Sequence, residues 1–218
     1  MPRNRVASSP RPETPPTAAA DMPAFDDPIE VPVPGLVVLV GAAGTGKTTL
    51  ATRLFARSEV LSSDGLRAAV SGDEADQRAT RPAFGILHRE IRTRLAAGRL
   101  VVVDATNVEA SARLTLRRLA ESAAASTVVI VLHLPAEDIH ARNAGRAGRV
   151  VPADVVDRHL ARLHGLGATP ETITARLRSE GFATVHVLSS AAEIDAAAIR
   201  RVPRASGPGP GSAGLSRP

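Results

Sequence analysis

The sequence contains no cysteine, no tryptophan and no tyrosine, and it has only four phenylalanines among 218 residues. The absence of cysteine excludes disulfide bonds, thiolate metal sites and cysteine nucleophiles. Aliphatic side chains must therefore pack the core, and the hydrophobic content of 44% is ordinary for a globular domain. No apolar run approaches the length of a membrane span, and no apolar stretch follows the arginines near the start. We therefore expect a cytoplasmic protein without a membrane partner.

Lysine is almost absent as well, because Lys47 is the only lysine among the 27 lysine and arginine residues. The net charge of +5 is modest, and it neither requires nor excludes a nucleic-acid partner. The preference for arginine over lysine resembles an effect of genome composition. Against that background, one lysine kept inside a glycine-rich segment is informative.

Both ends of the chain have compositions that resist packing. Residues 1–34 are rich in proline, and residues 202–218 are rich in proline and glycine. Such segments bury too little apolar surface to offset the loss of chain entropy, so we expect two disordered tails. The folded domain is expected to occupy residues 35–201.

Between these tails, apolar runs typical of buried strands alternate with segments of helical spacing. The expected strands are residues 36–40, 59–63, 99–107, 126–134 and 183–190. The expected helices are residues 47–57, 81–98, 108–124, 136–143, 152–163, 170–179 and 191–200. This alternation predicts an α/β fold in which a five-stranded parallel sheet carries helices on both faces.

The segment GAAGTGKT follows the first expected strand, precedes a helix and fits the phosphate-loop pattern G-x-x-x-x-G-K-[ST]. Its glycines allow backbone N–H groups to surround an anion, and the helix start adds the positive end of its dipole. Lys47 would reach the β- and γ-phosphates of a nucleotide, and the Thr48 hydroxyl would hold Mg²⁺. The alternative is a glycine-rich turn without a ligand. The expected nucleotide-binding residues are Gly41, Ala42, Ala43, Gly44, Thr45, Gly46, Lys47, Thr48 and Thr49.

Candidate side chains also follow the second and third expected strands. Asp64 in LSSDGLR could accept a proton from an attacking hydroxyl, and Arg67 could hold an anionic group of the acceptor. The alternative is that Ser63 or Asp64 only caps a helix. Asp104 in VVVDATN could orient Mg²⁺ or its water shell, or it could be a structural carboxylate that binds loop amides or Arg67. Parallel strands end at one edge of a sheet, so these side chains should face the phosphate loop.

Three arginines, Arg142, Arg146 and Arg149, recur at spacings of four and three in the segment ARNAGRAGRVVP. Glycines between them loosen the segment. This arrangement indicates an arginine-rich lid whose guanidinium groups would close over a transferring phosphoryl group. The alternative is a solvated basic face of a helix. The six histidines show no metal-ligand spacing, and we assign His159 and His164 to helix surface or packing.

These segments occur in the order found in the 5′-hydroxyl polynucleotide kinase domain of bacterial end-healing enzymes. The resemblance covers roughly residues 35–165, and its motifs are the phosphate loop, LSSDGLR, DQRAT, DATN and RNAGRAGRVVP. It implies the fold of a P-loop NTPase of the kinase type, with ATP and Mg²⁺ as cofactors. It also implies RNA or DNA 5′ ends as substrates and a separate phosphatase or ligase as a partner.

The resemblance also implies a role for each motif. In that family the phosphate-loop lysine and threonine bind ATP and Mg²⁺. The aspartate that matches Asp64 is the general base, and the arginine that matches Arg67 contacts an acceptor phosphate. The arginine that matches Arg146 stabilises the transferred phosphate, and those that match Arg142 and Arg149 lie nearby.

Together, these residues predict transfer of the γ-phosphoryl group of ATP to a hydroxyl. Asp64 is the expected base, while Lys47, Arg146 and Mg²⁺ would carry the developing charge. The favoured acceptor is the 5′-OH of a polynucleotide. Two alternatives stay open, namely a small-molecule kinase for a sugar, antibiotic or nucleoside and a non-catalytic ATP-binding switch module.

Overall fold

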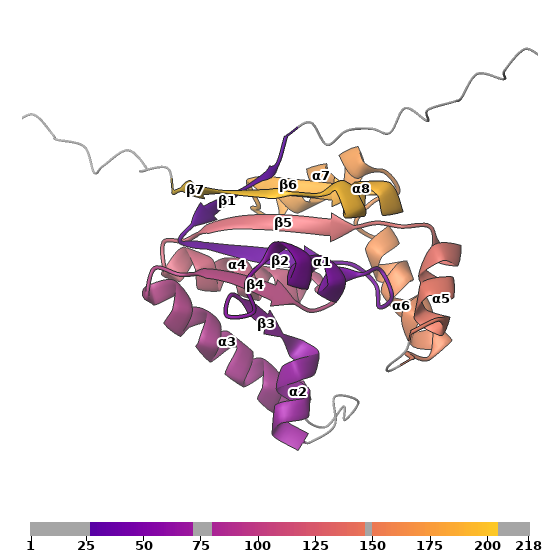
Figure 1. Ribbon diagram of the computed structural model, residues 1–218, viewed down its shortest axis with the longest axis horizontal. Helices are drawn as coiled ribbons and strands as arrows, with labels where there is room; N and C mark the ends of the chain where they lie inside the picture. Colours follow the sequence, from indigo (N-terminus) through magenta and orange to yellow (C-terminus); the bar gives the residue numbers. More distant parts are fainter. Residues whose placement is uncertain (1–26, 72–79, 147–149, 205–218) are drawn as a thin grey trace, which may run out of the picture.

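The computed structural model describes residues 27–71, 80–146 and 150–204, and Figure 1 shows how their elements are arranged. Five parallel strands form the main sheet in the order β3-β4-β2-β5-β6. Their bounds are β2 Gly35–Val40, β3 Val60–Ser62, β4 Leu100–Asp104, β5 Ser126–Leu132 and β6 Thr184–Leu188. The prediction of a five-stranded parallel sheet is confirmed.

Helices connect these strands, as parallel neighbours require. Their bounds are α1 Lys47–Leu54, α2 Ser63–Ser71, α3 Thr80–Ala96, α4 Ala110–Ser122, α5 Ala136–Ala144, α6 Ala153–His164, α7 Pro170–Ser179 and α8 Ala191–Ala196. Within the described ranges, no helix is both long enough and apolar enough to cross a membrane.

The central strand β2 shows how the core is divided, because all six of its residues are buried. Val37 and Leu39 belong to a cluster that includes side chains from α1, α5 and α6. Leu36, Val38 and Val40 belong to a second cluster that includes side chains from α3, α4 and α7. Successive side chains of a strand point to opposite faces, so helices cover both faces of the sheet, as predicted.

Two further strands, β1 Ile29–Val33 and β7 Ile199–Pro203, correct the sequence analysis. They pair in parallel with each other, and Ile29 is aligned with Ile199. Strand β1 lies inside the expected N-terminal tail, while β7 replaces the end of the helix expected over 191–200 and enters the expected C-terminal tail. These predictions were wrong because the pairing joins segments from opposite ends of the chain, which local composition does not show.

Burial explains why β1 is ordered despite its proline-rich surroundings. Ile29 and Val31 are almost completely buried and join the cluster around α1. The rest of the two expected tails, residues 1–26 and 205–218, lies outside the described residues.

Candidate active site

The phosphate loop connects the end of β2 at Val40 to the start of α1 at Lys47. Gly44 and Gly46 have φ angles of +91° and +96°, which L side chains rarely adopt. A Cβ atom at Gly44 would lie 2.8 Å from the carbonyl oxygen of Ile139 in α5. Glycine is therefore needed for the turn at both positions, as predicted, and at Gly44 also for the close approach to α5.

Lys47 is buried, and its ammonium group lies inside the loop. Its Nζ atom donates to the carbonyl oxygens of Gly41 at 2.9 Å and Ala42 at 2.7 Å. It also lies 3.4 Å from Thr45 Oγ1. An ammonium group has three donors, and here they face the loop itself. The charge is thus already positioned for an anion that the loop surrounds.

The surroundings of Lys47 change its protonation. Burial lowers the pKa of Lys47 to about 8, and the carboxylates of Asp104 and Asp64 oppose this effect. The positive charge of Arg146 lowers the pKa further. Lys47 is therefore charged at pH 7 and becomes neutral as the pH rises through 8, far below the range in which an exposed lysine titrates.

Because Lys47 is the only lysine, a sample labelled in lysine gives one side-chain NMR signal. We expect this signal to titrate near pH 8 in the folded, metal-free protein and near 10.5 in urea. Between these two pH values Lys47 is protonated in the unfolded chain but not in the folded protein. The free energy of unfolding should therefore rise with pH across this window. Asp104→Asn should lower the folded-state pKa further, because Asp104 is the main group that raises it. A folded-state titration near 10.5 would contradict this description.

Thr48 and Asp104 meet where β4 ends. The Thr48 hydroxyl donates to Asp104 Oδ2 at 2.8 Å, and Asp104 is buried. Burial raises the pKa of Asp104, while the hydrogen bond from Thr48 and the charge of Lys47 oppose the rise. The bond to Thr48 favours the interpretation of Asp104 as part of a nucleotide-metal site over a structural carboxylate bound to loop amides.

This donor set fits Mg²⁺. Mg²⁺ is commonly held by one or two carboxylates together with substrate phosphates and waters. Thr48 and Asp104 supply one hydroxyl and one carboxylate at the mouth of the phosphate loop. In the part of the chain that the structure describes, no group of three or more histidine, cysteine or acidic side chains could hold a metal ion. Nucleotide oxygens and waters would complete the shell of a Mg²⁺ ion held by Thr48 and Asp104.

Asp64 lies in the first turn of α2, directly after β3, and Arg67 follows it by three residues. Ser62 at the end of β3 is aligned with Asp104 at the end of β4, so both strands deliver polar groups to the same edge. The carboxylate of Asp64 accepts from the Arg67 guanidinium and lies 3.4 Å from Ser63 Oγ. The Asp64 side chain is 51% exposed, whereas that of Arg67 is 13% exposed.

A cavity of about 540 Å³ joins these groups. Its walls come from the phosphate loop and α1, from the start of α2, from α3, from the segment after β4, and from α5 and α6. The predicted site residues that line it are Ala43, Gly44, Gly46, Lys47, Thr48, Thr49, Asp64, Arg67, Asp104, Arg142 and Arg146. The structure therefore brings the candidate base, the phosphate loop and two lid arginines to one cavity.

Two of the three predicted lid arginines are described, and both come from the C-terminal part of α5 or directly after it. Arg142 Nη1 lies 3.8 Å from the position that a Cβ atom would take at Gly46. Arg146 is close enough to influence the pKa of both Lys47 and Asp104. Arg149 lies outside the described residues.

Asn143 fixes the segment that leaves α5, and the sequence analysis missed it. Its side-chain amide donates to the carbonyl oxygen of Val151 at 2.7 Å, and its Oδ1 atom accepts from the Val151 N–H at 3.1 Å. Asn143 is buried, and in the sequence it lies between Arg142 and Arg146, which both line the cavity. These bonds join the C-terminal part of α5 to Val151, which lies just before α6.

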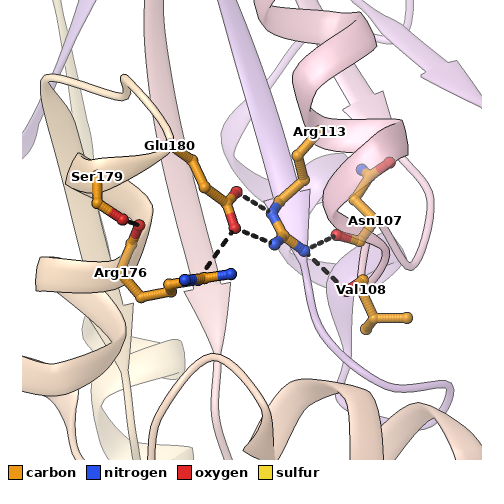
Figure 2. Close-up of polar contacts among 6 residues, drawn as sticks. All are labelled: Asn107, Val108, Arg113, Arg176, Ser179 and Glu180. Atoms are coloured by element: carbon orange, nitrogen blue, oxygen red, sulfur yellow. Dashed lines mark hydrogen bonds and ion pairs between the residues drawn. The ribbon is translucent and has the colours of Figure 1, made fainter.

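The segment after β4 forms a further wall of the cavity, and Figure 2 shows the buried arginine that supports it. Arg113 of α4 donates to the carbonyl oxygens of Asn107 at 2.9 Å and Val108 at 2.8 Å. It also makes two hydrogen bonds, of 2.8 and 2.6 Å, to the carboxylate of Glu180. Asn107 in turn donates to the carbonyl oxygen of Leu39 at 2.7 Å, which links this wall to β2.

Removing Arg113 should therefore destabilise the protein. The Arg113 side chain is 1% exposed. Arg113→Met leaves two carbonyl groups without this donor, and the Glu180 carboxylate keeps only its longer contact with Arg176, at 3.7 Å. We expect a loss of about 3–5 kcal/mol in the free energy of unfolding, measured by urea titration. The control is Arg158→Met, which breaks an exposed ion pair with Asp154 and should leave the free energy of unfolding nearly unchanged. Equal losses in the two variants would show that the buried pair is not an important support.

His159 of α6 also lines the cavity, although the sequence analysis assigned it to helix surface or packing. Its Nδ1 atom is buried and has no hydrogen-bond partner among the described residues. Burial, together with the charge of Lys47, lowers the pKa of His159, so the imidazole is neutral at pH 7. Val151 and Val155 line the cavity at intervals of four residues before it. That spacing indicates that the three residues share one side of the segment. Only the position of α6 beside the site shows that this side lines the cavity.

The fold and this cavity define a nucleotide-binding P-loop protein with a kinase-like architecture. A family model described as an AAA domain matches residues 36–166, which is more than half of the chain. The chain therefore belongs to that AAA domain family. No curated protein matches it.

Comparison with solved structures gives matches of low sequence identity. A sugar kinase from Janibacter sp. HTCC2649 is 22% identical, with 71% of this chain and 84% of that chain covered and a TM-score of 0.47. Kti12 from Chaetomium thermophilum in complex with ADP-AlF3 is 18% identical, with 73% and 93% covered and a TM-score of 0.52. A chain of the Pnkp1/Rnl/Hen1 RNA repair complex is 22% identical, with 62% and 45% covered and a TM-score of 0.50.

Proposed function

We propose that this protein transfers the γ-phosphoryl group of ATP to the 5′-OH of a polynucleotide. The observation that carries the proposal is that Lys47, Thr48, Asp64 and Arg146 line one cavity. These groups supply what phosphoryl transfer needs, namely a cradle for the phosphates, a base for the attacking hydroxyl and positive charge for the transition state.

Each side chain then has a role that follows from its place. Asp64 accepts the proton of the attacking hydroxyl, and its ion pair with Arg67 holds the carboxylate at the cavity wall. Lys47 and Arg146 balance the charge that develops on the transferred group. Arg142, beside the phosphate loop, contacts the nucleotide phosphates. Arg149 is proposed as the third arginine of the lid.

Thr48 and Asp104 would hold Mg²⁺, which when bound neutralises charge on the β- and γ-phosphates. The hydrogen bond between the two side chains keeps their oxygens adjacent before the nucleotide arrives. Burial of Asp104 limits the water around this position.

Two features support a polynucleotide acceptor. First, Arg67 is largely buried in the cavity wall beside Asp64, where it can hold the phosphate that follows the terminal nucleoside. Second, the motifs occur in the order of the end-healing kinases, and a chain of the Pnkp1/Rnl/Hen1 RNA repair complex has the same fold.

Salt dependence of oligonucleotide binding tests the acceptor. With a non-hydrolysable ATP analogue present, a 5′-OH oligonucleotide should bind with an affinity that falls steeply with salt. Two or three phosphate contacts on a single strand predict a slope of log K against log salt of about −1.4 to −2.1. Arg67→Met should make this slope shallower by about 0.7, whereas the exposed-residue control Arg118→Met should not change it. Tight binding of the nucleotide without any binding of the oligonucleotide would refute the polynucleotide acceptor.

A further inference from the structure

Phe84 of α3 differs from the other described phenylalanines. Phe55 and Phe182 are 5% and 1% exposed and belong to the two core clusters. Phe84 is half-buried and lines the cavity. The chain has neither tryptophan nor tyrosine. Phe84 therefore provides the cavity with a phenyl ring that is only partly covered by the core.

The ring of Phe84 is both anchored and accessible. It packs, together with Leu66 of α2, against the core cluster that includes α3 and α4 side chains. It also lines the same cavity as Asp64 and Arg67. Helices α2 and α3 pack against each other, so the ring lies on the side of the cavity that holds Asp64, and contacts with the core hold it in position.

His88 lies one helical turn after Phe84 and extends this aromatic surface. The two ring centroids are 6.2 Å apart, and the ring planes are inclined by 57°. Burial, assisted by the positive charge of Arg92, lowers the pKa of His88. The imidazole is thus neutral at pH 7 and packs beside the phenyl ring without adding a charge.

We infer that Phe84, supported by His88, is the surface on which the base of the acceptor's 5′-terminal nucleotide stacks. The inference rests on the proposed function and names its substrate more closely. Every nucleobase has a π-face, so stacking on one ring gives affinity without sequence preference. With Asp64 and Arg67 in the same cavity, one wall would contact the 5′-OH, the phosphate that follows and the base between them.

This geometry selects against acceptors that lack a base. A sugar alone would contact Asp64 and Arg67 but would leave the Phe84 ring exposed to water. A terminal nucleotide would cover it, and the buried ring area would then contribute to acceptor affinity. The polynucleotide is therefore recognised by the stacking of its last base and by its backbone charge.

Steady-state kinetics with matched acceptors test the inference. Phe84→Leu keeps an apolar side chain against the core but removes the aromatic face. We expect it to raise KM for a 5′-OH oligonucleotide about tenfold and to leave KM for ATP unchanged. With an acceptor whose 5′-terminal nucleotide is abasic, wild type and Phe84→Leu should have the same KM. An acceptor that is abasic only at an internal position should behave as the intact one.

The outcomes separate this inference from the proposed function. If the wild-type protein phosphorylates no oligonucleotide, the proposed function fails and the inference with it. If it phosphorylates the oligonucleotide and Phe84→Leu raises KM equally for intact and abasic acceptors, only the stacking is refuted, because the residue then acts through the core.

A binding measurement gives a second readout that does not depend on turnover. Phe84→Trp introduces the only tryptophan and retains an aromatic face, so its emission reports on position 84 alone. We expect an intact oligonucleotide to quench this emission, and an acceptor abasic at the 5′ end to bind about tenfold more weakly with little quenching. Equal quenching by the two acceptors at saturation would overturn the inference.

Discussion

Asp64→Asn is expected to lower kcat by about 10²–10⁴-fold while the affinity for ATP stays close to that of the wild type. Asparagine keeps the shape of the side chain but cannot accept the proton of the attacking hydroxyl. The change also removes the negative charge that Arg67 contacts, so the local geometry must be checked in the variant. Single-turnover transfer from ATP to a 5′-OH oligonucleotide measures the effect.

Asp195→Asn is the matched control for this prediction. Asp195 lies exposed on α8 and does not line the cavity. The Asp195→Asn substitution should therefore leave kcat unchanged. If Asp64→Asn keeps most of its activity, Asp64 is not the base, and the first turn of α2 then has a structural role only.

Arg146→Met is expected to lower kcat by about 10³-fold or more, with a much smaller effect on ATP binding. Arginines that contact the transferring group act mainly on the transition state, and their removal has effects of this order in other phosphoryl-transfer enzymes. Arg146 is close enough to Lys47 and Asp104 to influence the pKa of both, so its charge acts at the phosphate end of the cavity.

The control for Arg146 is Arg118→Met, since Arg118 is exposed on α4 and outside the cavity. Arg146→Lys should recover little activity, because an ammonium group cannot present the planar, two-pronged contact of a guanidinium. A rise in the Kd for ATP that accounts for the whole loss of kcat/KM would contradict a role in the transition state.

The central fold was predictable because its signals are local. The apolar runs of β2, β4 and β5 are long and end beside glycine or polar residues, as strands buried on both faces do. The phosphate loop was predictable because the features that require its glycines and Lys47, namely backbone geometry and charge, lie within eight residues. The parallel order of the strands then placed Asp64 and Asp104 at one edge.

What could not be predicted depends on contacts between distant segments. The pairing of β1 with β7 joins Ile29 to Ile199, and neither segment signals its partner. Arg113 looks like an ordinary helical arginine until Glu180 is placed beside it. His159 became a cavity residue only through the path of α6. These side chains are set by tertiary structure, which overrides their local preferences.

The most direct test of the proposed function is transfer of labelled γ-phosphate from ATP to a 5′-OH oligonucleotide in the presence of Mg²⁺, with Lys47→Ala as the control. We expect label at the 5′ end with the wild-type protein and none with the variant, because the only lysine of the chain lies in the phosphate loop. The same oligonucleotide carrying a 5′-phosphate should take no label. ATP binding without label on the 5′-OH oligonucleotide would contradict the proposed polynucleotide kinase activity.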